Sequence, residues 1–447
     1  MTPSGLLLHA FGPRYDLPLS LALFIYAAAG VVVISFVMVT VLAGDRVGDR
    51  AIRYPTWPAP GLPAIDRSPW SRRIGGLLGL AALGTVIGTG LFGSQNPFYS
   101  VAEYVVWIYV WAGLVILTGL VGNLWEYLNP FAALDGLVRR VYDPPPGRLP
   151  ERLGIWPAIA LFYGFVFLEL ASGMANQPRL IGLLTLLYTM LNLAGMLTFG
   201  RQAWLSRVEF LTVLFDLVSR FSPIERTEAG GLAFRPWGAG LLRPYPAGWD
   251  RVVFVILMLS TLAFDGLIAT AQWQALSTAL EPYWTPLGAF GFAAVRGLGI
   301  LALTVVFLAV FNTIVRLVIY FGYVKVDVPA TLSAFALTLV PIALVYNAAH
   351  NYSYLVVNSQ NLVPLIPGVG AYQVSYLLAN AAVVWYVQLI LIVIGHVIAV
   401  YLAHLRAGER FKTAKNALLS QYPMLLLMVT YTMTSLWILA QPTTRGG

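Results

Sequence analysis

The sequence contains no cysteine. Without thiols, the chain forms no disulfide, no thiolate zinc site, no iron–sulfur cluster and no covalently attached haem. Charged residues are also scarce, at 10% of the 447 residues, whereas a soluble domain carries roughly 25%. So few charges do not cover a water-facing surface, and 59% of the residues are hydrophobic. The composition therefore excludes an ordinary soluble domain and predicts an integral membrane protein.

Long hydrophobic runs predict an all-α, polytopic membrane helical bundle that forms a single transmembrane domain over residues 1–447. About ten runs are long enough, or nearly so, to cross ~30 Å of hydrocarbon as helices. A shorter stretch, 207–220, carries charges at its polar positions, which predicts an amphipathic helix at the membrane interface. The predicted spans lie at roughly 17–43, 74–92, 104–128, 154–172, 180–199, 251–272, 297–320, 329–350, 379–405 and 421–441.

Basic residues indicate the orientation of these spans. The formal net charge is +8, and 23 of the 27 Lys and Arg residues lie in alternate connections between the runs. By the positive-inside rule these connections are cytoplasmic, so both termini are non-cytoplasmic. We therefore expect a multi-pass protein of the inner (plasma) membrane whose main partner is the lipid bilayer. Since the basic loops carry no interleaved aromatic patch, no nucleic-acid partner is expected. A hydrophobic small molecule remains a candidate partner.

Burying an ionisable side chain in lipid costs several kcal/mol of free energy, so each such residue within or beside the runs marks a candidate site. With the predicted orientation, six polar groups lie near the outer interface: His9, Asp16, Glu103, Glu169, Asp265 and His350. Two interpretations remain open for this outer cluster. Its members are either paired structural groups near the lipid headgroups, or a set of imidazole and carboxylate ligands for a divalent cation.

The remaining histidines do not favour a haem. His396 lies about 24 Å below the outer face at 1.5 Å per helical residue, whereas His350 lies close to that face. The two histidines therefore cannot ligate the iron of the same haem. A haem is therefore not expected, and His396 is interpreted as a hydrogen-bonded helix-packing residue.

Three other features are interpreted structurally. Asn-Pro-Phe triplets at 96–98 and 129–131 predict helix starts capped by the asparagine side chain. Glu126 is expected to pair with an arginine of a loop. The uncharged stretch 351–378, which is interrupted by proline and glycine, predicts a re-entrant or interfacial cap over the outer cluster.

Five motifs lie along nearly the whole chain: HAFGPRYDLPL at 9–19, VGNLWEYLNPF at 121–131, LAFDGL at 262–267, VWYVQLILIVIGHVIAVYLAHLRA at 384–407 and SLWILAQP at 435–442. Together they resemble the fenitrothion hydrolase family of multi-pass membrane proteins. Two positions depart from the family pattern: Ala10 replaces a glycine and Asn347 replaces a histidine.

The resemblance implies hydrolysis of a hydrophobic, organophosphate-type ester at the outer leaflet. In that interpretation a divalent metal ion, bound by His9, His350 and Asp265, activates a water molecule. Asp265 and Glu169 are then the candidate catalytic residues. Two other classes remain open from the sequence: a transporter or permease, and a non-catalytic membrane subunit of a respiratory or metal-handling complex.

Overall fold

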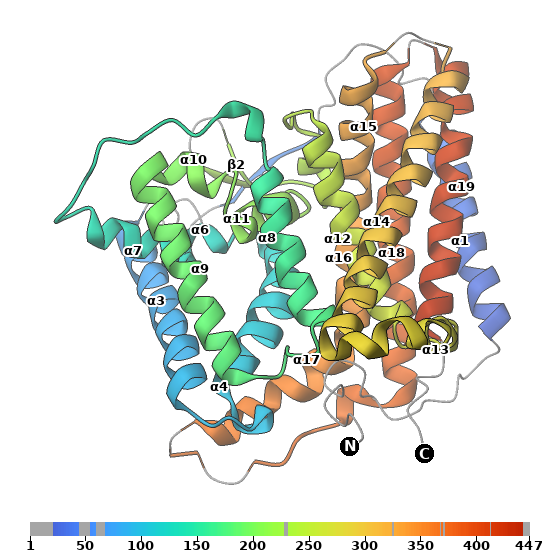
Figure 1. Ribbon diagram of the computed structural model, residues 1–447. Helices are drawn as coiled ribbons and strands as arrows, with labels where there is room; N and C mark the ends of the chain where they lie inside the picture. The colour runs from blue at the N-terminus through green and yellow to red at the C-terminus, as the bar shows by residue number, and fades with distance from the viewer. Residues whose placement is uncertain are drawn as a thin grey trace. The chain divides into compact units, whose positions relative to one another are not determined.

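The computed structural model describes residues 21–43, 54–59, 68–227, 231–323, 326–366, 368–369, 372–411 and 413–440. These residues form mainly long helices, with one small sheet (Figure 1). Within the described ranges, nine helical runs are long and apolar enough to cross a membrane. The predicted all-α membrane bundle is thus confirmed in its class.

The chain divides into two compact units. Of the described residues, unit 1 comprises those within 56–235 and 354–376, and unit 2 comprises those within 21–55, 236–353 and 377–440. Both units consist largely of apolar helices, so the division does not test the predicted single transmembrane domain, which stays a prediction.

Unit 1 is built around α3 and α9, which pack side by side (Figure 1). A Cβ on Gly90 of α3 would lie only 2.8 Å from the Cα of Gly182 of α9, so the two backbones approach closely because both residues lack a side chain. The elements of unit 1 are β1 Trp57–Pro58, α3 Pro69–Phe92, η1 Pro97–Tyr99, α4 Val101–Glu103, the π-helix η2 Tyr104–Leu114, α5 Val115–Val121, α6 Trp125–Leu128, α7 Pro130–Val138, η3 Glu151–Leu153, α8 Trp156–Val166, the π-helix η4 Phe167–Ala171, α9 Pro178–Phe199, α10 Arg201–Leu205, α11 Phe210–Ser219, β2 Ile224–Arg226, β3 Leu232–Phe234 and η8 Ser359–Leu365.

The amphipathic stretch 207–220 forms the helix α11, but its apolar side does not face lipid. Val213, Leu214 and Phe215 are buried, and the helix packs against α5 and α8. The expectation of an interfacial helix was therefore wrong about its environment: protein covers the face that the sequence assigned to the membrane. Next to it, β1, β3 and β2 form a small antiparallel sheet in that order, which the sequence did not predict.

Unit 2 holds the longest helices, and α14, α16, α18 and α19 run alongside one another (Figure 1). The run α15–η7–α16 is the most enclosed, with 83% of the candidate span buried. It packs against α12, α14 and α18. The elements of unit 2 are α1 Leu21–Ala43, η5 Ala239–Leu242, α12 Trp249–Leu267, α13 Ala271–Trp284, η6 Thr285–Leu287, α14 Gly288–Phe321, α15 Val328–Ala336, η7 Leu337–Leu339, α16 Val340–His350, η9 Leu377–Ala379, α18 Ala381–Arg410 and α19 Ala414–Leu439. The helix α17 Tyr352–Asn358 begins in unit 2 and continues into unit 1.

Each predicted span contains a helix, with two differences of detail. The third run ends at Val121, and Gly122, whose φ is 110°, separates it from the short helix α6. The helix α13 was not predicted, and it runs crosswise to α14 at one end of that helix (Figure 1). The amphipathic composition of α13 is too polar for a span, so hydropathy alone did not reveal it.

Candidate functional site

Asp265 and His350, two members of the predicted outer cluster, form a hydrogen-bonded pair in unit 2. The Oδ2 atom of Asp265 lies 2.8 Å from Nε2 of His350. Both side chains are 14% exposed. Asp265 lies in the last turn of α12, and His350 is the last residue of α16. The sequence placed these two residues at one depth, and the structure confirms that they meet.

Aromatic and amide side chains surround the imidazole of His350. The ring of Tyr346, one turn earlier on α16, stacks on it with centroids 6.0 Å apart and planes inclined by 8°. Asn347 is buried beside it, and its Oδ1 accepts a hydrogen bond of 3.0 Å from Nδ2 of Asn351. The Nδ2 group of Asn347 and the hydroxyl of Tyr346 are buried without a hydrogen-bond partner. The environment of the pair is therefore polar but incompletely satisfied, which is typical of a site rather than of a packed core.

Glycines allow the helices to approach closely at this point. A Cβ on Gly266 would lie 2.9 Å from the hydroxyl of Tyr346 and 2.3 Å from Cγ2 of Ile438 on α19. A Cβ on Gly395 of α18 would lie 2.1 Å from Val345 of α16. The two glycines thus allow the close helix packing that places His350 next to Asp265.

The geometry of the pair determines its chemistry. Hydrogen bonding to the carboxylate of Asp265 places a proton on Nε2 of His350 and leaves Nδ1 as the acceptor. In that tautomer the imidazole accepts a further proton at Nδ1, and the carboxylate stabilises the imidazolium that forms. The pair is therefore a proton-accepting group inside an apolar bundle.

The predicted metal site stays a prediction, because His9, one of its three ligands, lies outside the described residues. Among the described residues, no three His, Asp or Glu side chains come together as possible ligands. The other two predicted ligands, Asp265 and His350, bond each other.

Glu169 belongs to the other unit. It lies in the π-helix η4 of unit 1, with its side chain partly buried, whereas Asp265 and His350 lie in unit 2. Its predicted catalytic role stays a prediction. The segment 354–376, predicted to cap the outer cluster, also belongs to unit 1, where Tyr109 of η2 donates a hydrogen bond of 2.8 Å to the carbonyl of Ser359.

The structural interpretations of single residues are confirmed. His396 is buried, with Nδ1 2.8 Å from the carbonyl oxygen of Ile392. The side chain of Asn96 accepts a hydrogen bond from the backbone of Phe98, and that of Asn129 accepts one from Ala132. Glu126 pairs with Arg226 of strand β2 at 3.0 Å.

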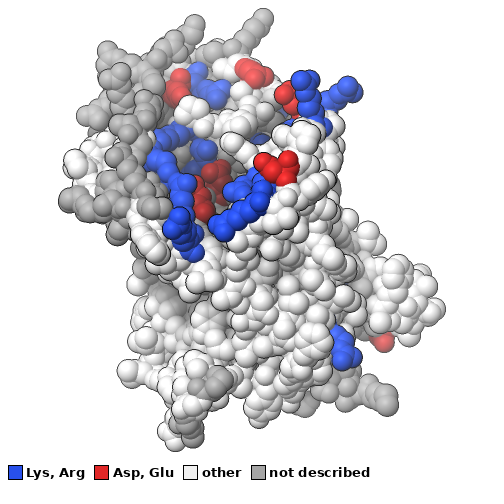
Figure 2. All heavy atoms as spheres, turned by 90° about the vertical axis from the view of Figure 1, so that its left-hand side faces the viewer, with Lys and Arg blue, Asp and Glu red and all other residues white. Residues whose placement is uncertain are grey.

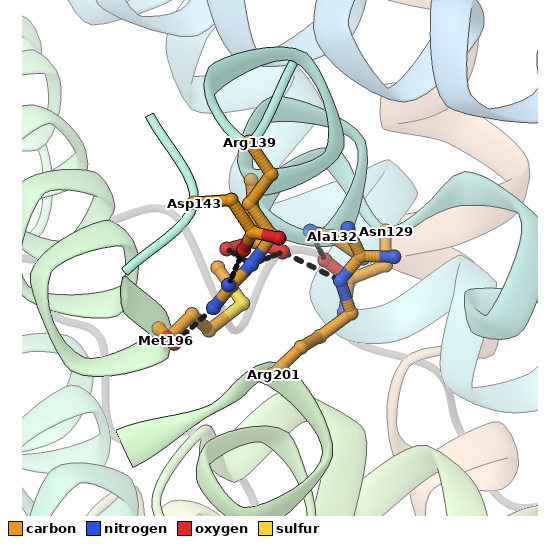
Figure 3. A network of polar contacts seen from close by, with 7 residues as sticks. Asn129, Ala132, Arg139, Asp143, Met196 and Arg201 are labelled. Atoms are coloured by element: carbon orange, nitrogen blue, oxygen red, sulfur yellow. Dashed lines mark hydrogen bonds and ion pairs between the residues drawn. The ribbon is translucent and has the colours of Figure 1, made fainter. Parts of the chain in front are cut away.

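Charged side chains are unevenly distributed over the surface. On the face shown in Figure 2 they gather at the upper end, and the surface below is almost free of them. A wide uncharged zone of this kind is expected of a surface that faces lipid. Asp135 of α7 is part of a charged network in unit 1, where it accepts from Nε of Arg139 at 2.9 Å and from Nε of Arg201 at 2.6 Å (Figure 3).

Sequence reasoning missed a second buried carboxyl group, Glu209. It caps the start of α11 by accepting from the backbone of Leu211 and Thr212, and it also accepts from the hydroxyl of Tyr188 at 2.7 Å. Burial raises the pKa of Glu209, and the hydrogen bonds from Thr212, Tyr188 and Leu211 only partly offset this effect. The sequence signal was a glutamate directly before an apolar helical stretch, which is the position of an N-cap.

No protein-family model, curated protein or solved structure matches this chain. The resemblance to the fenitrothion hydrolase family therefore stays a prediction.

Proposed function

We propose that this chain is a membrane hydrolase of hydrophobic, organophosphate-type esters, in which Asp265 and His350 form the general base. The observation that carries the proposal is the 2.8 Å contact between a carboxylate and an imidazole at the ends of two packed helices. An oriented imidazole with a free acceptor nitrogen is the usual general base of hydrolytic enzymes. The motif resemblance points to the same reaction.

The proposed topology places this pair near the outer leaflet. The proposal counts α12 as a tenth span beside the nine apolar runs of the described residues. A helix of 19 residues such as α12 is about 28 Å long, which is sufficient for a span. With the basic loops in the cytoplasm of a plasma membrane, both termini are non-cytoplasmic, and an ester dissolved in lipid reaches the pair from the outer leaflet.

The mechanism uses one water molecule. Nδ1 of His350 accepts a proton from water while Asp265 accepts a hydrogen bond from Nε2–H. The water oxygen then forms a bond to the phosphoryl or acyl centre, and the bond from that centre to the leaving oxygen breaks. The imidazolium returns its proton to the leaving alkoxide or phenolate, so the products are an acid and an alcohol.

The experiment measures 4-nitrophenolate release by the purified protein from a dialkyl 4-nitrophenyl phosphate and from 4-nitrophenyl carboxylates. General-base catalysis contributes about 10²–10⁴-fold, so His350→Gln is expected to lower the rate by about 100-fold or more. Asp265→Asn keeps the imidazole but no longer stabilises its cation, so a large loss is expected there too.

The matched control is His404→Gln. His404 also bonds a neighbouring side chain, with Nδ1 2.7 Å from Oε1 of Gln421, but it lies on α18, and the imidazole that bonds Asp265 is that of His350. Its rate should equal that of the wild type. Hydrolysis that survives in His350→Gln would refute the proposal, and loss of activity with a chelator would replace the metal-free route by a metal-dependent one.

One observation favours a second candidate, a proton-coupled transporter. The helix that carries His350 is interrupted by the 3-10 segment η7 and by Pro341, and interrupted helices with buried ionisable residues are common in transporters. Proton uptake by proteoliposomes that depends on Asp265, in protein that shows no ester hydrolysis, would favour this candidate over the hydrolase.

A further inference from the structure

Unit 1 contains an open cleft beside Glu103 that the proposed hydrolase does not use. Residues of η1, α4, η2 and the loop after η4 form one side, and residues of α17 and η8 form the other. Its enclosed part measures about 50 Å³. The hydrogen bond from Tyr109 to Ser359 links η2 to η8.

Glu103 is the acidic residue of this cleft. It is only 6% exposed, and its Oε1 atom is buried without a hydrogen-bond partner. Among the described residues, those that line the cleft include no Lys, Arg or His. A buried carboxylate is costly unless a cation or hydrogen-bond donors stabilise it, so the cleft lacks a positive partner for its own acid.

The aromatic walls beside Glu103 are held in fixed orientations. The indole N–H of Trp107 donates to the carbonyl of Ala175 at 3.0 Å, and the hydroxyl of Tyr104 donates to the carbonyl of Phe98 at 3.1 Å. The polar atoms of both rings are already bonded, and Trp107 and Tyr104 are only 2% and 8% exposed, so a ligand meets just the parts of these rings that line the cleft. Aromatic faces attract cations, most strongly those of Trp and Tyr.

Amide side chains complete the cleft on its other side. Asn358 of α17 and Asn361 of η8 are partly buried and line it. Carboxamides both donate and accept hydrogen bonds, so they suit the polar end of an organic molecule without adding charge.

We propose that this cleft binds a small organic ammonium ion. The N–H groups of the ligand donate to the carboxylate of Glu103, and its positive charge and apolar body lie against the rings of Tyr104 and Trp107. A resident metal ion fits less well, because the described residues gather no three His, Asp or Glu ligands. The proposal is independent of the hydrolase function, because Asp265 and His350 belong to unit 2.

The π-helix that follows Glu103 supports a binding role. The residues Tyr104–Leu114 form η2, which begins directly after Glu103. π-helical segments are rare and are frequently found at functional sites.

The test measures binding of 2-phenylethylammonium and of its neutral isostere 2-phenylethanol by isothermal titration calorimetry. The full-length protein is placed in lipid nanodiscs at pH 7, and empty nanodiscs provide the reference. A charge-assisted hydrogen bond is worth about tenfold or more in affinity, so the wild type is expected to prefer the ammonium ion by at least this factor. Glu103→Gln is expected to abolish the preference.

Glu151→Gln is the matched control, because Glu151 is an exposed glutamate of the same unit. It should retain the full preference for the ammonium ion. The wild type alone shows whether the cleft prefers the ammonium ion to the alcohol. The proposal therefore remains testable even if Glu103→Gln does not fold. Equal affinity of the wild type for both ligands, binding no greater than to empty nanodiscs, or a preference that persists in Glu103→Gln would each overturn the proposal.

Discussion

Buried carboxyl groups of the described residues differ mainly in the kind of partner they have. Asp135 accepts from two guanidinium groups, Asp265 from an imidazole, and Glu209 from neutral hydroxyl, indole and amide groups. Glu103 has a buried oxygen with no partner at all. The partner determines whether each group stabilises the fold or remains available to a ligand.

The Asp135 network gives a prediction on stability (Figure 3). Asp135→Asn removes a fully buried carboxylate and leaves Arg139 and Arg201 without their shared partner. Because the side chain of Arg201 is 43% exposed, water takes over part of the interaction, and the free energy of unfolding should fall by about 2 kcal/mol. Unfolding in mixed micelles with increasing dodecyl sulfate measures the change.

The same network contains the control for this experiment. Asp143 also pairs with Arg139, but its side chain is 67% exposed. Asp143→Asn should therefore change the free energy of unfolding by less than about 0.5 kcal/mol. Equal effects of the two substitutions would show that burial does not decide the strength of these pairs.

Glu209, which lies outside the candidate spans, gives a prediction on pH. Since its pKa is raised in the folded protein, the folded state binds more protons than the unfolded state once the pH exceeds the ordinary glutamate value of 4.5. Stability from this group therefore falls as the pH rises from that value towards the raised pKa. The stability advantage of the wild type over Glu209→Gln should shrink as the pH rises from 4.5 to 7 in thermal unfolding experiments. An advantage that grows with pH would contradict the raised pKa.

Helix contacts at the candidate site give a prediction at the scale of elements. In Gly266→Ala the new methyl group meets Ile438 and the hydroxyl of Tyr346, so α12 must move away from α19 and from Tyr346. Overpacking of this kind costs about 1–3 kcal/mol, and ester hydrolysis should fall with it because His350 stacks on Tyr346. Gly30→Ala in α1, where the new methyl group meets nothing within 4 Å, should leave both stability and hydrolysis unchanged. A stable, fully active Gly266→Ala protein would show that the close approach is dispensable.

The sequence predicted the helices well because membrane spans carry a strong local signal. Continuous apolar runs identified every long helix, and an asparagine before proline identified the cap of α7 at Asn129. The meeting of Asp265 and His350 was predicted from depth alone, since each lies near the same end of its span. These features depend on position along one helix, which composition records directly.

What the sequence did not predict depends on how helices pack around one another. Depth does not tell which face of a helix a residue occupies, so the separation of Glu169 and Asp265 into different units was not foreseen. The cleft at Glu103 requires the segment around Ser359, which comes about 250 residues later in the chain. Such long-range contacts leave no local pattern in a single sequence.

At the scale of the whole molecule, the absence of cysteine makes the proposed topology directly testable. Single cysteines introduced at Met174, in the loop before α9, and at Glu151, in the loop before α8, lie in exposed positions of connections predicted on opposite sides. In spheroplasts a membrane-impermeant maleimide should label Met174→Cys and leave Glu151→Cys unlabelled until the membrane is opened. The cysteine-free wild type is the blank, and the reverse labelling pattern would invert the topology and move Asp265 to the cytoplasmic side.

The enclosed run α15–η7–α16 has a consequence for biogenesis. The ribosome completes this helix before it makes α18, although α18 covers one of its sides in the finished unit. During that interval the newly inserted helix lies against lipid or the translocation machinery, and the side of α16 that α18 later covers is still open. Enclosure of Asp265 and His350 is therefore a late, post-insertion event that depends on the synthesis of α18.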